Sequence, residues 1–169
     1  MKLTSSQAVK LLRRLNEEYD TIIAEEKESR SFVAAIQEDL EDARPLYDFE
    51  ATQKKLDVLD RQIRTVKHAV NIFNTTHEVP DFGMTIDEVL VYLPQLTRKK
   101  EKLLKMSRRL EKQRIDSGYG SSSSNIEYDY ANYSIQAAKD MLSEVSETLG
   151  RLQTALDIVN NQETMEINI

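Results

Sequence analysis

The sequence predicts an all-α protein, and three observations support this fold class. Only four glycines and three prolines occur in 169 residues, too few for the many turns of an all-β chain. Residues that favour helices, such as Leu, Glu, Lys, Gln and Ala, are abundant. Apolar residues also recur in alternating steps of three and four, the spacing of a helix–helix seam. We therefore expect one domain over residues 1–169, built from four long antiparallel helices in an elongated bundle or coiled coil.

The first helix is expected over about residues 5–42. Thr4 and Gln7 have the spacing of a capping box at its start, and Pro45 disfavours its continuation. Its apolar seam has a polar break in the middle and comprises Ala8, Leu12, Leu15, Tyr19, Ile22, Glu26, Ser29, Val33, Ile36 and Leu40. Such a helix is longer than the others, so part of it should project or pack against another subunit.

The second helix is expected over about residues 49–74, with Asp48 as its N-cap. It should end in the stretch "NTTHEVPDFG", which is rich in residues that break helices. Its seam repeats the heptad spacing and comprises Phe49, Thr52, Leu56, Leu59, Ile63, Val66, Val70 and Phe73.

The third helix is expected over about residues 86–114. Thr85 and Glu88 match a capping box, and Met84 and Val89 occupy the two positions of a hydrophobic staple. Pro94 lies inside the predicted helix and should kink it.

The fourth helix is expected over about residues 134–161, capped by Ser134 or Asn132. Its seam comprises Ile135, Ala138, Leu142, Val145, Leu149, Leu152, Leu156 and Val159. Further apolar residues beside all these seams widen the apolar stripes beyond those of a two-stranded coil, which favours a bundle.

Residues 116–125 are rich in Ser and Gly and predict a flexible connection before the last helix. After them, Ile126, Tyr128 and Tyr130 alternate with acidic residues, the period of a short, half-buried strand. This strand would need to pair with the loop 77–82 or with the same segment of a second chain. We expect both tyrosines to be substantially buried on one side.

Tyr128, Tyr130 and Tyr133 allow three interpretations. They could cover the end of the bundle and start the last helix, as amphipathic residues at an edge. They could instead form a contact surface for a partner or ligand, because aromatic residues are enriched in interfaces. A phosphate-binding role for "SGYGSSSS" is the least favoured, since the lysine pattern and preceding strand of a P-loop are both lacking.

The sequence offers little chemistry for catalysis. It has no cysteine and two histidines, His68 and His77, neither of which follows a glutamate by three residues as in di-metal bundles. His68 is expected at the surface or boundary of its helix. His77 with Glu78 and Asp81 could make only a weak metal site on a loop without fixed geometry. We predict a protein that is not an enzyme, with no catalytic residues, metal or cofactor.

Residues 98–114 carry a strongly basic stripe, although the formal net charge of the chain is −6. Its candidate contacts to phosphates or nucleic acid are Arg98, Lys102, Lys105, Arg108, Arg109 and Lys112. The alternative, which the overall acidity favours, is a match within or between subunits to the acidic residues of the first helix: Glu25, Glu26, Glu28, Glu38, Asp39, Glu41 and Asp42.

No apolar run long enough for a signal peptide or a membrane span occurs, so a cytoplasmic protein without membrane contact is expected. Taken together, these features predict a non-enzymatic helical protein that works by association, as a homo-oligomer or with a protein partner. The alternative function is nucleic-acid binding through the basic stripe of residues 98–114.

Three stretches, "AVNIFNTT…DFGMTIDEVL", "FVAAIQEDLEDARP" and "LGRLQTALDIVNN", are similar to those of a family of small uncharacterised bacterial helical proteins, some labelled septicolysin. In that family an Asn-x-x-Asn helix end precedes a Gly-x-Thr helix start, and Asn71, Asn74, Gly83 and Thr85 match these positions. The resemblance implies an α-helical, cytoplasmic protein and transfers no active site.

Overall fold

The computed structural model describes residues 1–115 and 126–169, and the chain is mostly helical, as predicted. The helices of this described part are α1 (Ser5–Ser29), α2 (Leu40–Ala43), α3 (Phe49–Thr76), α4 (Ile86–Ser107) and α5 (Ile135–Gln162). Its strands form three antiparallel pairs: β1 (Lys2–Thr4) with β6 (Thr164–Glu166), β2 (Glu78–Val79) with β3 (Met84–Thr85), and β4 (Lys112–Arg114) with β5 (Tyr128–Tyr130). The chain divides into two compact units, one comprising Met1–His77 with Ile158–Ile169 and the other comprising Glu78–Asp157.

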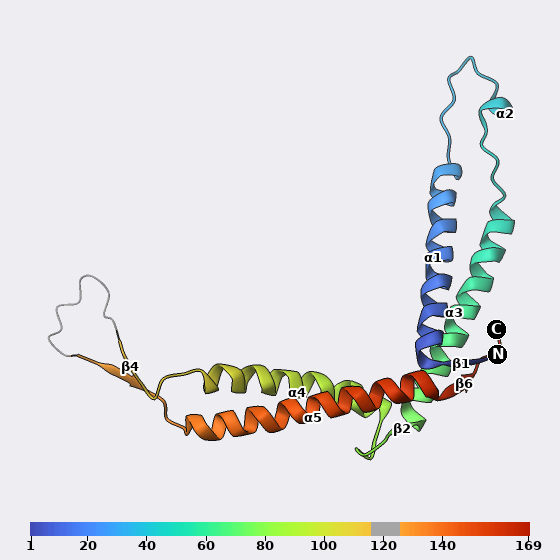
Figure 1. The fold of residues 1–169 in the computed structure, drawn as a ribbon. Coiled ribbons are helices and arrows are strands. Elements are labelled where there is room, and N and C mark those ends of the chain that lie inside the picture. Colours follow the sequence, from blue (N-terminus) through green and yellow to red (C-terminus); the bar gives the residue numbers. More distant parts are fainter. Residues whose placement is uncertain (116–125) are drawn as a thin grey trace. The chain divides into compact units, whose positions relative to one another are not determined.

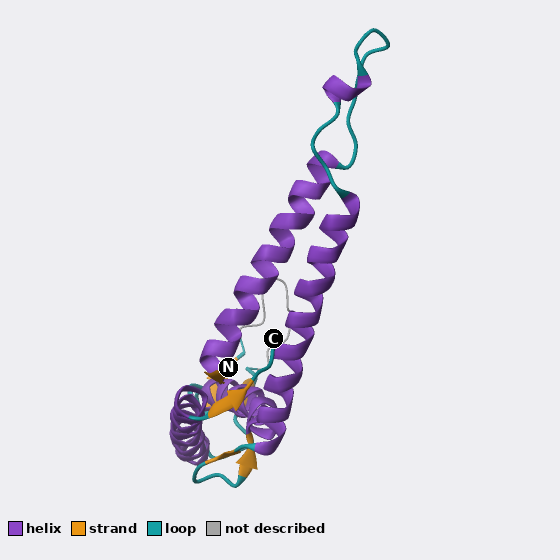
Figure 2. Cartoon of the chain, turned by 90° about the vertical axis from the view of Figure 1, so that its right-hand side faces the viewer, coloured by secondary structure: helices purple, strands orange, loops and turns teal. Residues whose placement is uncertain are grey.

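In the first unit, α1 and α3 lie side by side as a helical hairpin (Figures 1 and 2). The buried side chains follow the predicted heptad seams: Ala8 and Leu15 on α1, and Leu56, Leu59, Ile63, Val66 and Phe73 on α3. The capping box at the start of α1 is confirmed, because the Gln7 N–H donates to Thr4 Oγ1 at 3.3 Å and the Thr4 N–H donates to Gln7 Oε1 at 3.0 Å. Asp48 caps α3 as predicted.

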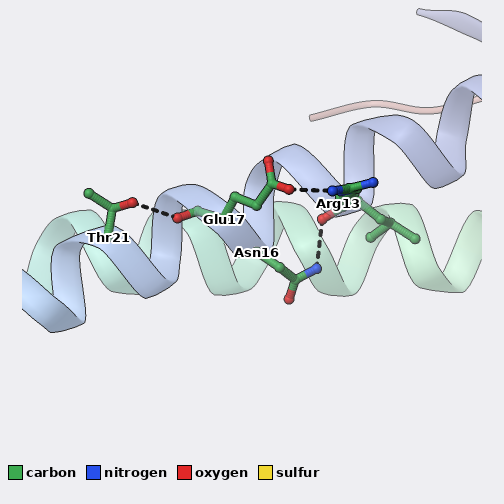
Figure 3. A network of polar contacts seen from close by, with 5 residues as sticks. Arg13, Asn16, Glu17 and Thr21 are labelled. Carbon is green, nitrogen blue, oxygen red and sulfur yellow. Dashed lines mark hydrogen bonds and ion pairs between the residues drawn. The ribbon is translucent and has the colours of Figure 1, made fainter.

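The exposed face of α1 is held by polar contacts within the helix (Figure 3). Arg13 Nε donates to Glu17 Oε1 at 2.8 Å, and the Thr21 hydroxyl donates to the Glu17 carbonyl at 2.8 Å. Asn16 Nδ2 donates to the Leu12 carbonyl at 2.6 Å. These bonds span one helical turn, so this face is satisfied locally.

The prediction that the first helix continues to about residue 42 is wrong, because α1 ends at Ser29. Glu26, in the last turn of α1, already bonds to Tyr47, just before α3, and to Gln53 in the first turns of α3. Beyond Ser29 the seam therefore has no α3 residue to pack against, and Val33 and Ile36 are 97% and 104% exposed. A helix without such packing is marginal in water, so only the short α2 forms in this connection.

The β1–β6 pair was not foreseen from the sequence. Its register places Leu3 opposite Met165, and Met1 and Ile167 exchange backbone hydrogen bonds at 2.7 and 2.9 Å. Met165 and Ile167 are buried, and β6 packs on α3. Strand β6 thus covers part of the α3 surface that α1 leaves uncovered.

In the second unit, α4 runs beside the part of α5 that belongs to this unit (Figures 1 and 2). The buried side chains again follow the predicted seams: Ile86, Val89, Leu96 and Leu103 on α4, and Ala138, Val145, Leu149, Leu152 and Leu156 on α5. Pro94 lies within α4, whose span is unbroken from Ile86 to Ser107. Ser134 caps α5, since its Oγ accepts from the Ala137 N–H at 3.1 Å.

The start of α4 matches its predicted signals. Asp81 and Gly83 have positive φ angles of 67° and 59° and turn the chain between β2 and β3. The capping box then forms, because the Glu88 N–H donates to Thr85 Oγ1 at 3.3 Å and the Thr85 N–H donates to Glu88 Oε2 at 2.7 Å. Val89, the inner residue of the predicted staple, is fully buried.

The prediction that the third helix continues to about residue 114 is also wrong, because α4 ends at Ser107. The Ser107 hydroxyl donates to the Leu104 carbonyl at 3.0 Å, and the Tyr133 hydroxyl donates to the Met106 carbonyl at 2.9 Å. The Arg109 N–H also donates to the Met106 carbonyl, at 3.3 Å, so these carbonyls of the last turn are satisfied without a further helical turn. The chain that follows then enters β4 rather than a further helical turn.

Strand β5 confirms the strand predicted from the alternating tyrosines, but its partner within the chain differs from the one expected. It pairs with β4, in the segment that was expected to be helical, and not with the loop 77–82. The Ser/Gly-rich connection expected at 116–125 lies outside the described residues.

Candidate functional site

Two surfaces of the described chain are the candidates for a functional site. The first, here called the apical segment, is the connection 30–48 between α1 and α3, which Figure 1 shows with α2 at the far end of the hairpin. The second, called the β4–β5 ribbon, extends beyond the last turn of α4. The two surfaces belong to different units.

The apical segment exposes a series of large apolar side chains, which are Phe32, Val33, Ile36, Leu40 and Leu46. Its few internal contacts are polar or charged. The Ala35 N–H donates to Glu38 Oε2 at 2.8 Å, and Arg44 lies over the Phe32 ring at 5.9 Å while pairing with Glu41 at 3.0 Å. None of these contacts covers Val33 or Ile36.

The base of the apical segment is held by the polar break of the α1 seam. Glu26 Oε1 accepts from the Tyr47 hydroxyl at 2.5 Å and from Gln53 Nε2 at 2.9 Å. The hydrogen bond to Glu26, with smaller contributions from desolvation and from the charge of Glu26, raises the pKa of Tyr47 above 10.0. The glutamate thus joins the end of α1 to the start of α3.

The β4–β5 ribbon has two chemically different faces. Its register places Lys112 opposite Tyr130 and Arg114 opposite Tyr128, and residues directly opposite in an antiparallel pair share a face. Lys112 Nζ lies 3.9 Å from the centre of the Tyr128 ring and 5.5 Å from that of Tyr130. This face is therefore basic and aromatic.

The opposite face of the ribbon contains Gln113 and Asp129, which are paired across the strands. Arg109, just past the end of α4, forms an ion pair with Asp129. Arg109, one of the six predicted anion contacts, is thus already paired with an acidic neighbour. Lys112, another of the six, lies over the rings of Tyr128 and Tyr130.

The structure brings the predicted tyrosines and the end of the basic stripe together at one site. Tyr128 and Tyr130 are 41% and 59% exposed, so the prediction that both are substantially buried is wrong. Every residue of β4 and β5 is exposed in the described part of the chain, in agreement with the exposure of the two tyrosines. Tyr133 is half-buried and bonded to the end of α4, which leaves it little role in an external contact.

The remaining predicted cations lie along α4. Arg98, Lys102 and Lys105 are exposed and follow one another in steps of four and three, so they share one face of the helix. Arg108 is the exposed C-cap residue of α4. The pairing of β4 with β5 at this helix end was missed from the sequence, because residues 110–115 show no alternation of apolar and polar residues.

Both histidines line a cavity of about 450 Å³ between α3 and the C-terminal strand of the first unit. The ring of His77 stacks on Phe73 at 4.0 Å, and its Nδ1 lies 3.1 Å from the Phe73 carbonyl oxygen. His68 is exposed, as expected for a surface position. Within the described residues, no group of three or more His, Asp or Glu side chains is placed to hold a metal ion.

No helix in the described part of the chain is both long and apolar enough to cross a membrane.

Comparison with models of known families and with curated proteins finds no match. The fold is similar to the crystal structure of a functionally unknown conserved protein from Corynebacterium diphtheriae, with a TM-score of 0.59 and 14% sequence identity. The alignment covers 98% of this chain and 100% of that chain, and at this identity the likeness concerns the fold alone.

Proposed function

We propose that this is a non-enzymatic helical protein that works by association, and that its primary partner is a second copy of the same chain. The observation that carries the proposal is the apical segment of the first unit. Val33, Ile36 and Leu40 continue the heptad seam of α1 beyond the point where α3 can cover it, and all three are exposed. Exposed apolar groups in a long connection usually mark an interaction site.

A second copy suits this surface because it carries the same apolar row. Two identical segments can pack on each other across a two-fold axis, each supplying the partner that the other lacks. The packed segment could then become helical, since burial of an apolar face supplies most of the stability of a helix in a protein.

The finer features expected from the sequence belong to the same proposal. An elongated arrangement of four long antiparallel helices in coiled-coil register is supported by the heptad-spaced buried rows on α1, α3, α4 and α5. The single domain, the cytoplasmic location and the absence of catalysis and cofactors stay predictions from the sequence.

Sedimentation velocity over a range of micromolar concentrations tests the association. The wild type should form a dimer or larger species, and the double variant Val33→Asp/Ile36→Asp should be monomeric, because four buried charges per dimer are costly. Val91→Asp is the matched control, since Val91 is an exposed valine of α4 in the other unit. It should leave the oligomeric state unchanged.

Circular dichroism gives an independent measure of the same event. Helical content should rise with protein concentration in the wild type as residues 30–42 become helical, and should stay constant in the double variant. A wild type that is monomeric at all concentrations, or a double variant that associates as well as the wild type, would contradict the proposal.

A further inference from the structure

We propose that the basic and aromatic face of the β4–β5 ribbon binds single-stranded nucleic acid. Tyr128 and Tyr130 would supply ring surfaces for unstacked bases, while Lys112 and Arg114 contact the phosphates beside them. The site goes beyond the proposed association, which rests on residues of the other unit.

The two tyrosines are suited to stacking. Both are exposed, their ring centres are 6.3 Å apart, and the rings are tilted by 52° to each other. A base has a π-face whatever its sequence, so exposed aromatic rings in a basic groove are the usual means of binding single strands without sequence preference. Rings that only stabilised the fold would be expected to lie under other side chains.

The charges around these rings fit a polyanion. Arg114 lies opposite Tyr128 and Lys112 lies opposite Tyr130, so a cation accompanies each ring on the same face. Lys112 also contacts both rings, which holds its ammonium group next to the stacking surface. A strand bound there could exchange this cation–π contact for a phosphate contact.

The exposed row on α4 extends the basic surface towards the ribbon. Residues 98–114 contain nine basic and two acidic side chains, in a chain whose formal net charge is −6. Attraction for nucleic acid is therefore expected at this stretch rather than from the chain as a whole. The row formed by Arg98, Lys102 and Lys105 could follow the phosphates of a strand whose bases reach the tyrosines.

Single-stranded nucleic acid fits this surface better than other anionic partners. The bases of a duplex are already stacked on each other and cannot reach the rings, and an acidic peptide would not use them. Anionic lipid would require a larger contiguous apolar surface beside the cations than the three exposed aliphatic side chains that flank the strands, Leu110, Ile115 and Ile126.

Fluorescence anisotropy with labelled oligo-dT, oligo-U and a DNA duplex, at several salt concentrations, tests the site. Single strands should bind more tightly than the duplex. Tyr128→Leu/Tyr130→Leu should weaken single-strand binding by about tenfold or more, because stacking is lost. Tyr128→Phe/Tyr130→Phe should retain it. Anionic vesicles and an acidic peptide serve as competitors.

The charge contribution is tested separately. Lys112→Gln/Arg114→Gln should weaken binding and lower the slope of log K against log salt by roughly 1 to 1.5, for two lost phosphate contacts. Arg61→Gln/Lys67→Gln removes the same charge from exposed positions of α3 and should have little effect. Circular dichroism confirms that each variant is folded.

Three outcomes overturn the inference. They are no binding of single strands at low salt, equal binding of single strands and duplex that is insensitive to the Tyr→Leu changes, and displacement by vesicles or acidic peptide as effectively as by unlabelled single strand. Because the oligomeric state is measured with other variants, failure of this site leaves the association proposal standing, and the reverse also holds.

Discussion

The apical segment and the β2–β3 turn both precede a long helix, yet they differ in almost every physical respect. Residues 30–48 contain no glycine, leave their large apolar side chains in solvent and form only the four-residue α2. Residues 78–85 turn through Asp81 and Gly83, bury Val79 completely and deliver the chain to the capping box of α4.

The difference shows what an apolar seam needs in order to become a helix. The seam of α1 continues past Ser29 with correct heptad spacing, but no helix among the described residues covers Val33 or Ile36. The β2–β3 turn needs no such partner, because its turn and cap are satisfied within a few residues. Spacing alone therefore indicates where a helix can pack, and the neighbouring element decides whether it does.

The largest expected effect compares two positions of the same predicted seam. Leu15→Ala should lower the free energy of unfolding by about 2–5 kcal/mol, because Leu15 is only 4% exposed and its loss leaves a cavity. Val33→Ala, at a fully solvated position, should change it by less than about 0.5 kcal/mol. Urea unfolding at concentrations below those of association measures both.

Equal costs for the two substitutions would break the comparison. They would mean that residues 30–42 are packed in the isolated chain, and that the exposure of Val33 does not describe its environment in solution.

Much of the helical fold could be predicted because its signals are local. The capping boxes at Thr4 and Thr85, the N-cap Asp48 and the buried seam positions each depend on residues within one or two turns. The errors at the ends of the first and third predicted helices have a different origin. There the outcome depends on pairing with distant residues, such as Glu26 with Tyr47 or Lys112 with Tyr130.

Only the separate components of the candidate site could be predicted from the sequence, and their arrangement could not. The basic stripe and the tyrosines were identified as separate features, since each is visible in composition and spacing. The stripe and the tyrosines come together because β4 pairs with β5. The two strands are separated in the sequence by residues that include 116–125, and no local rule fixes the register of such a pair. The β1–β6 pair was missed for the same reason, because its strands are at opposite ends of the sequence.

A smaller effect should distinguish two glycines of the second unit. Gly83 has a φ of +59° in the β2–β3 region, whereas Gly150 is helical within α5, and a Cβ added to either would meet no atom within 4 Å. Gly83→Ala should destabilise by about 1–2 kcal/mol, because the left-handed conformation is unfavourable for alanine. Gly150→Ala should stabilise by up to about 1 kcal/mol.

Thermal unfolding of the two alanine variants measures both signs. A Gly83→Ala variant as stable as the wild type would show that the β2–β3 turn can adopt another backbone conformation. The contrast between this turn and the apical segment would then be lost.

The smallest expected effect concerns the charge at the end of the β2–β3 turn. Glu88 accepts hydrogen bonds from the backbone N–H and then the hydroxyl of Thr85, which lowers its pKa below 4.5. A carboxylate with a depressed pKa stabilises the folded state above its unfolded pKa, and this contribution is lost as pH falls through the folded value. The difference in unfolding free energy between wild type and Glu88→Gln should therefore be largest at pH 7 and become smaller below about pH 4.5.

The capping box of Thr4 is the control, because it uses the neutral Gln7. The effect of Gln7→Ala on the unfolding free energy should therefore stay constant over the same pH range. Urea midpoints at a series of pH values compare the two boxes, and a Glu88→Gln difference that is flat or grows on acidification would show that the Thr85 bonds do not favour the charged carboxylate.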